Sequence, residues 1–224
     1  MQDIQIMPSI LAADFGALRA GCERAAAAGA DQLHVDVMDG VFVPNISFGP
    51  EAVRVAAGAV SIPLNVHLMV VNPMPYLEVF AEAGSDTMLV HVESDCDAES
   101  ALREIRRWGK RAGITINPNT AAERVFALVD EGLVDEVLVM SVEPGFGGQA
   151  YMASAEPKLA ALRARYAALD LSVDGGINGA TVKGAAEHGA NLIVAGSYLF
   201  GQEDMKASIR ELRESAVESR LRKR

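Results

Sequence analysis

Two histidines and two aspartates carry the clearest chemical signal in the sequence. His34 and Asp36 lie two residues apart in HVDVMDG, a segment whose apolar residues are otherwise typical of a buried strand. Side chains alternate along a strand, so these two share a face, where a buried carboxylate is rare unless it is paired or ligated. His67 in VHLMV and Asp174 in VDGG stand in two further apolar segments. Together they offer two nitrogen and two oxygen ligands.

Such a ligand set suits one divalent transition metal ion per chain, with Zn²⁺ the first choice and Fe²⁺, Mn²⁺ or Co²⁺ the alternatives. A hydrogen-bonded structural role is the competing interpretation for His34 with Asp36. We expect that structural role for His91, which has no partner motif. We expect His188, in AAEHG, to interact with the end of its own helix.

Glycine clusters follow three of the apolar segments. They occur in VMSVEPGFGGQ, VDGG and AGS, and no lysine or arginine accompanies them. Glycine lets backbone N–H groups approach an anion closely, so we predict that these amides and Ser197 bind a phosphate. Ordinary turns are the alternative. The glycines concerned are Gly145, Gly147, Gly148, Gly175, Gly176 and Gly196.

The composition excludes several classes of function. A Schiff-base aldolase needs a lysine in its site, and acyl transfer needs a serine or cysteine held against a base; the pattern provides neither. The formal net charge of −10 argues against a nucleic-acid surface. The sequence has neither an apolar run of about 18 residues nor a signal-peptide layout, so we predict no membrane association and a cytoplasmic location.

One short pattern recurs four times and divides the chain. It consists of the end of a helix, a glycine, an Asp or Asn, and an apolar segment. The glycines are Gly29, Gly84, Gly132 and Gly189. Their spacing suits two strand–helix units each, and alanine-rich helical stretches follow nearly all of the expected strands. We predict strands at Ile4–Ile10, Gln32–Met38, Leu64–Met69, Thr87–Val92, Ala112–Asn117, Glu136–Ser141, Leu171–Asp174 and Leu192–Ala195.

Eight strands alternating with eight helices predict a (β/α)₈ TIM barrel, a single catalytic domain over residues 1–224. An open doubly wound sheet is the alternative, but no GxGxxG follows the first strand. In such a barrel the carboxyl ends of the strands carry the chemistry. That is where all four candidate ligands lie.

Long motifs in the expected order resemble the ribulose-phosphate 3-epimerase family, whose barrel is of the ribulose-phosphate binding type. They are MPSILAADF, HVDVMDGVFVPNISFGP, VHLMV, VMSVEPGFGGQ, VDGGI and VAGSYLFG, from Met7 to Phe200. The resemblance implies a metal-dependent isomerase that inverts C3 of a sugar phosphate, interconverting D-ribulose 5-phosphate and D-xylulose 5-phosphate in the pentose phosphate pathway of carbohydrate metabolism.

The resemblance also assigns roles to residues. It implies that His34, Asp36, His67 and Asp174 hold the metal, with Asp36 the proton acceptor and Asp174 the proton donor. Met38, Met69 and Met140 would cover the reacting carbons. The implied substrate contacts are Ser9, His67, Gly145, Phe146, Gly147, Gly148, Asp174, Gly175, Gly176, Gly196 and Ser197.

Two positions depart from the family pattern. Asn65 stands where the family often carries Asp, and Ser172 where Glu or Gln is frequent. Each lies two residues before a proposed ligand on the same face of its strand, so we expect altered hydrogen bonding around the metal and altered metal preference.

Three rival functions stay open. The nearest is a 3-epimerase of a six-carbon ketose phosphate such as allulose 6-phosphate. A decarboxylase or hexulose-phosphate synthase would need a lysine beside the aspartate, where DVMDG has methionine. A non-catalytic sugar-phosphate sensor would not need both aspartates. We expect a homo-oligomer, with Val41–Phe48 as a lid or an oligomer contact.

Overall fold

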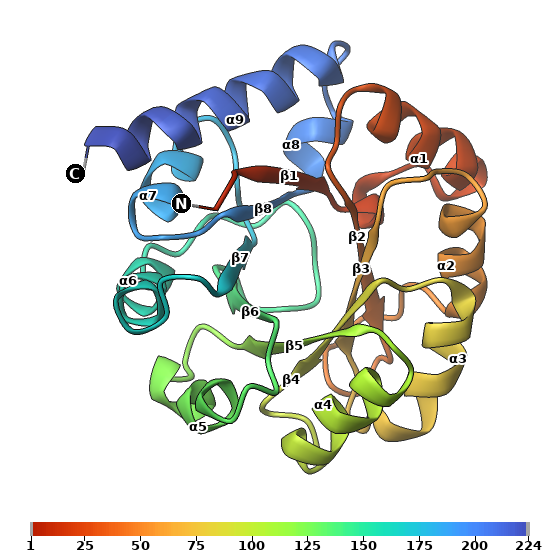
Figure 1. Ribbon diagram of the computed structural model, residues 1–224. Helices are drawn as coiled ribbons and strands as arrows, with labels where there is room; N and C mark the ends of the chain where they lie inside the picture. The colour runs from red at the N-terminus through yellow and green to blue at the C-terminus, as the bar shows by residue number, and fades with distance from the viewer. Residues whose placement is uncertain (1, 223–224) are drawn as a thin grey trace.

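The computed structural model describes residues 2–222 and shows a ring of eight parallel strands surrounded by helices (Figure 1). Each strand pairs with its neighbour in sequence from β2 to β8, and β1 pairs with β8. A parallel bridge between Ser9 and His34 joins β1 to β2 and closes the ring. The strands are β1 Gln5–Pro8, β2 Leu33–Met38, β3 Leu64–Met69, β4 Thr87–His91, β5 Arg111–Ile116, β6 Glu136–Met140, β7 Asp170–Asp174 and β8 Leu192–Ala195.

The closed ring confirms the TIM barrel and makes the open-sheet alternative wrong. All eight predicted strands are found, with ends that differ by at most two residues. Closure brings the carboxyl ends of distant strands to one rim, which is what the candidate site requires. That residues 1–224 form one domain stays a prediction, and residues 1, 223 and 224 lie outside the described range.

Helices cover the outside of the ring. A single α-helix follows each of the first seven strands, as predicted, but two follow β8, of which α9 packs against α7 and β1 (Figure 1). They are α1 Leu18–Ala27, α2 Pro50–Ala57, α3 Leu77–Ala83, α4 Ala98–Arg107, α5 Phe126–Asp130, α6 Ala155–Arg165, α7 Thr181–Glu187, α8 Ser197–Phe200 and α9 Met205–Arg222. Short 3₁₀ helices span Ile10–Ala12, Phe15–Ala17, Met74–Tyr76 and Ala122–Val125.

Alternation along the strands separates two environments. On β2, Val35 and Val37 belong to the large apolar cluster that includes buried helix residues. His34 and Asp36 are equally buried but belong to the other face, which lines the inside of the barrel. The helix face completes the core; on α4, for example, Leu102 is fully buried. The inward face of β2 therefore carries polar residues, while its outward face packs against the helices.

The glycines that divide the sequence have the backbone conformation expected of them. Gly29, Gly84, Gly132 and Gly189 all have positive φ, between 71° and 116°. At Gly84 an added Cβ would also lie 2.7 Å from the Cβ of Ala57, so α3 could not end there with a larger residue. The four glycines of the recurring pattern thus lie at turns from a helix to the next strand.

Among residues 2–222, no helix combines the length and apolar character needed to cross a membrane.

Candidate metal and acid–base site

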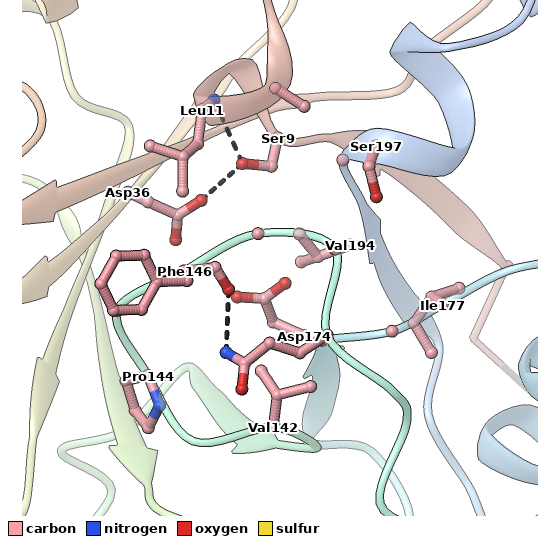
Figure 2. A pocket seen from close by; sticks show the side chains of 18 of the residues that line it. Ser9, Leu11, Asp36, Val142, Pro144, Phe146, Asp174, Ile177, Val194 and Ser197 are labelled. Atoms are coloured by element: carbon pink, nitrogen blue, oxygen red, sulfur yellow. Dashed lines mark hydrogen bonds between the residues drawn. The ribbon is translucent and has the colours of Figure 1, made fainter. Parts of the chain in front are cut away.

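A pocket of about 390 Å³ opens at the carboxyl ends of the strands, as predicted for the site (Figure 2). Its volume suits a small ligand. No lysine or arginine of residues 2–222 lines it; Lys158 donates instead to the backbone oxygens of Asn117 and Pro118. The predicted site residues in its lining are Ser9, Asp36, Met38, Met69, Met140, Gly145, Phe146, Gly147, Gly148, Asp174, Gly175, Gly176, Gly196 and Ser197.

Four side chains at this end of the barrel could hold a metal ion. His34, Asp36, His67 and Asp174 each offer one ligand atom, and these atoms all lie within 4.8 Å of one another. Asp36 on β2 is the register partner of His67 on β3, while Asp174 ends β7. Residues separated by up to 140 positions are therefore brought together only by closure of the barrel.

The His67 ring is held in one orientation by a chain of hydrogen bonds that runs through His91 to Glu93. Its Nε2 lies 2.8 Å from Nε2 of His91, and Nδ1 of His91 lies 3.1 Å from Oε2 of Glu93. The Glu93 carboxylate also accepts from the Asn117 amide at 2.9 Å. With His91 donating to Glu93, its Nε2 must accept from His67, which leaves the lone pair of His67 on Nδ1. That nitrogen lies 3.1 Å from Oδ1 of Asp36.

The His34 ring is held in the same manner. Its Nδ1 lies 2.9 Å from Oδ1 of Asn65, an acceptor, so this nitrogen carries the proton. Its Nε2 is buried, lies 3.2 Å from Oδ1 of Asp36, and makes no hydrogen bond within the described chain. In their neutral forms, His34 and His67 would each direct a nitrogen lone pair at one carboxylate oxygen. A cation relieves that arrangement, so the residues fit a metal ion.

The two carboxyl groups of the site have pKa values that are shifted in opposite directions. Burial raises the pKa of Asp174 to about 7, with a contribution from the charge of Asp36. Burial also acts against ionisation of Asp36, but contacts with His34 and His67 outweigh it and hold its pKa far below the usual range. Although burial lowers it, the pKa of His34 is raised to about 9 by Asp36, Asp174 and Glu136, whereas burial lowers that of His67 to about 3. One carboxyl group is thus ionised while the other can hold a proton.

Ser9 and the methionines complete the inner wall. The Ser9 hydroxyl donates to Oδ2 of Asp36 at 2.5 Å and accepts from the amide of Leu11 at 3.3 Å (Figure 2). Met38, Met69 and Met140 are all buried and line the pocket. Their thioethers carry no strong hydrogen-bond donor, so this part of the pocket is apolar beside the two carboxyl groups.

Four of the glycines that line the pocket fall into two groups by the space around them. At Gly175 an added Cβ would lie 2.5 Å from Cγ2 of Val142, and at Gly176 it would lie 2.4 Å from the nitrogen of Tyr151. Both have positive φ, so the fold itself requires glycine there. At Gly147 and Gly148 an added Cβ would meet nothing within 4 Å, although Gly148 also has positive φ, +75°. Those two leave open space beside the pocket.

The loop between β2 and α2 reaches the pocket from one side. Asp39 accepts from the amides of Val41 and Phe42 and so forms the turn that ends the strand. Asn45 Nδ2 donates to the backbone oxygen of Gly145 at 2.8 Å and so ties this loop to the glycine-rich loop after β6. Val41 is 77 % exposed. Whether Val41–Phe48 acts as a lid or an oligomer contact stays a prediction.

Sequence reasoning missed the partners of the ligands. His91 is a buried, hydrogen-bonded residue as expected, and its contact with His67 was not predicted. The contact of His91 with Glu93, two residues later in the chain, was not predicted either. The HVE spacing carried the signal, since it resembles the HVD of His34 and Asp36. His188 contacts the backbone oxygen of Gly184 at 2.7 Å, at the end of its own helix as predicted.

Comparison with known proteins decides among the families that share this fold. Residues 5–200 match the family described as "Ribulose-phosphate 3 epimerase family". The chain belongs to the ribulose-phosphate 3-epimerase family. It is 43 % identical over 213 residues to "Ribulose-phosphate 3-epimerase, cytoplasmic isoform" of Oryza sativa subsp. japonica, covering 94 % of this chain and 93 % of the relative. It is 42 % identical over 218 residues to "Ribulose-phosphate 3-epimerase" of Bacillus subtilis (strain 168), covering 95 % of this chain and 99 % of the relative.

Solved structures of low sequence identity share the barrel. The chain aligns with 3-hexulose-6-phosphate synthase from Salmonella typhimurium at a TM-score of 0.75 and 15 % identity, covering 96 % of this chain and 100 % of the other. It aligns with 3-keto-L-gulonate-6-phosphate decarboxylase from Vibrio cholerae O1 at a TM-score of 0.75 and 17 % identity, covering 97 % and 99 %. These likenesses confirm the fold alone; membership of the epimerase family rests on the sequence matches.

Proposed function

We propose that the protein is an isomerase that interconverts D-ribulose 5-phosphate and D-xylulose 5-phosphate by inverting C3. Membership of the epimerase family supports the reaction. The observation that carries it is a pair of carboxyl groups, Asp36 and Asp174, which belong to one ligand cluster and have pKa values shifted in opposite directions. A sugar-phosphate sensor would have no use for such a pair.

Inversion requires proton removal on one face of C3 and proton delivery on the other. Asp36, ionised and held by the Ser9 hydroxyl, is the acceptor. Asp174, whose raised pKa keeps it partly protonated near neutral pH, is the donor from the opposite side. The two strands that carry them, β2 and β7, are separated in the ring by β1 and β8. In the reverse direction the two residues exchange roles.

His34, Asp36, His67 and Asp174 would hold one divalent metal ion, for which we propose Zn²⁺ first and Fe²⁺, Mn²⁺ or Co²⁺ as alternatives. When bound, the ion supplies Lewis acidity at the substrate's oxygens, worth several kcal/mol. Met38, Met69 and Met140 would exclude water from the reacting carbons. They have no acidic proton that could compete with Asp174.

The phosphate end of the substrate would lie against the glycine-rich loops. With no lysine or arginine of residues 2–222 in the lining, backbone N–H groups and the Ser197 hydroxyl would have to bind it. The open space beside Gly147 and Gly148 gives the phosphate room. The other proposed contacts are Ser9, His67, Gly145, Phe146, Asp174, Gly175, Gly176 and Gly196.

Incubation with ribulose 5-phosphate in deuterium oxide tests the proposal. We expect xylulose 5-phosphate to form with deuterium at C3, observed by NMR. Absence of both products with metal-loaded protein would contradict it. Parallel assays with allulose 6-phosphate test the runner-up function, a six-carbon 3-epimerase, which higher kcat/KM on that sugar would support.

Assembly and location stay predictions. Size-exclusion chromatography with light scattering tests the expected homo-oligomer. The cytoplasmic location agrees with the name of the rice relative, although a relative in Arabidopsis thaliana is named chloroplastic.

A further inference from the structure

One buried carboxyl group has no part in the proposed reaction. Glu136 lies on β6 inside the barrel and is 0 % exposed. A buried carboxylate is costly unless its oxygens accept hydrogen bonds. Both oxygens do: Asn65 Nδ2 donates to Oε2 at 2.8 Å, and Ser172 Oγ donates to Oε1 at 2.6 Å. The partners of Glu136 are therefore the two residues at which the sequence departs from the family pattern.

Glu136 reaches Asn65 across the interior of the barrel, because β5 and β4 separate their strands in the ring. The adjacent position on β5 is Gly113, the register partner of Glu136. An added Cβ at Gly113 would lie 2.1 Å from Cδ2 of Leu89, so this layer has no room for another side chain. The packing of the interior thus leaves space for the Glu136 side chain to reach Asn65 and for no further side chain at this position of β5.

The hydrogen bond to Glu136 decides which way the Asn65 amide faces. Its NH₂ group must lie toward the carboxylate, since the reverse orientation would set two acceptor oxygens against each other. Its oxygen then faces Nδ1 of His34 at 2.9 Å and accepts the proton of that nitrogen. In the neutral ring, the form that binds metal, the lone pair of His34 is thereby left on Nε2, the buried atom without a hydrogen-bond partner in the described chain.

We infer that Glu136 is a positioning residue for the metal site: acting through Asn65, it fixes the tautomer and orientation of His34 so that Nε2 faces the ion. The inference rests on the proposed function in taking His34 as a metal ligand. Asn65 is a neutral amide, so its influence on His34 comes from its orientation, which its hydrogen bond to Glu136 sets. Partners of this kind typically change metal affinity 10- to 100-fold when they are removed.

Metal affinity of the full-length protein tests the inference directly. Chelator competition with Co²⁺ as the probe gives the affinity, and the visible absorption of Co²⁺ reports the ligand geometry. We expect about a 10-fold loss for Glu136→Gln and up to about a 100-fold loss for Asn65→Ala. The double variant should bind no more weakly than Asn65→Ala alone, because Glu136 acts through Asn65.

Exchanging the amide and the carboxylate between positions 65 and 136 distinguishes a positioning role of Glu136 from general damage to the barrel. Asn65→Asp alone sets two carboxylates against each other and should weaken binding. Combined with Glu136→Gln, the new carboxylate faces His34 while the new amide donates to it, so affinity should return to within a few-fold of the wild type. Failure of this rescue would overturn the inference. Thr115→Val is the matched control, since Thr115 is also fully buried but its hydroxyl has no partner in the described chain.

A measurement on the wild type covers the case in which the variants do not fold. In ¹⁵N-histidine spectra of the Zn²⁺-loaded protein, His34 should carry its proton on Nδ1; a proton on Nε2 would overturn the inference. If the wild type binds Co²⁺ and Glu136→Gln matches it within two-fold, Glu136 has no such role while the proposed function stands. If the wild type binds no metal and exchanges no deuterium at C3, the proposed function itself fails and this inference with it.

Discussion

The hydroxyl of Ser9 donates a 2.5 Å hydrogen bond to Oδ2 of Asp36, and the backbone of the same serine forms the bridge to His34 that closes the ring. Strand β1 thus supports the proposed proton acceptor from a position at the seam of the barrel. The resemblance to the family pointed to Ser9 as a substrate contact. Its observed partner is Asp36, the proposed proton acceptor, which gives Ser9 a separate, testable role.

Ser9→Ala should lower kcat by about 10- to 100-fold, because a hydrogen bond to a charged group is typically worth 1.5–3 kcal/mol. Metal content should not change, since Ser9 is not a ligand. Steady-state kinetics and metal analysis of the purified protein check both. Ser208→Ala, on α9 away from the pocket, is the control. Unchanged kcat would show that Asp36 needs no support from Ser9.

Asp174→Asn should lower turnover by about 10²- to 10⁴-fold, the typical worth of a positioned acid or base. The amide keeps an oxygen for the metal but cannot deliver a proton. Because Asp36 still removes the proton of C3, ribulose 5-phosphate should gain deuterium from deuterium oxide faster than it is converted. NMR of the recovered sugar measures both rates, with metal content as the control. Near-normal turnover would remove Asp174 from the mechanism.

Metal binding should release protons. In the metal-free protein the pKa of His34 is raised to about 9 and that of Asp174 to about 7, so both hold protons at pH 6. Ligands bind metal in their deprotonated forms, so affinity should rise as pH increases from about 6 to about 9. Calorimetry in buffers of different ionisation enthalpy should count roughly one proton at pH 8 and nearly two at pH 6. Release that does not vary with pH would contradict these protonation states.

The two groups of glycines should respond differently to alanine. Gly176→Ala should destabilise the protein, because φ is +65° and the new Cβ would lie 2.4 Å from the nitrogen of Tyr151. Gly147→Ala should leave the melting temperature within a few degrees of wild type while raising KM, since its methyl group enters open space meant for substrate. Thermal unfolding and kinetics separate the two. An unchanged KM for Gly147→Ala would place the phosphate elsewhere.

Local patterns were sufficient to predict the barrel and to single out the four side chains that cluster at its rim. Positive-φ glycines such as Gly84 and alternating runs such as HVDVM are short-range features whose meaning depends on few neighbours. The hydrogen-bond partners of the ligands could not be predicted in the same way. Glu136 and Asn65 are 71 residues apart and meet only because the interior of a closed barrel brings them together. Their pairing depends on side-chain packing, for which the sequence has no periodic signal.

The same limit explains His91. A histidine in an apolar strand usually has a local hydrogen-bond partner, and Glu93 does provide one. Its second contact, with His67 on the adjacent strand, depends on the stagger of β3 against β4. Residue spacing along the chain does not reveal the register between two strands, although the strands themselves were located correctly.

The seam between β1 and β2 has a consequence for how the enzyme is made. All other neighbouring strands share at least two register pairs, whereas these two meet through a single bridge between Ser9 and His34. A chain that has formed every helix but left this seam open has no complete site. Catalytic activity therefore depends on closure of the ring, and a cation held by residues of β2, β3 and β7 would link strands on the two sides of this seam.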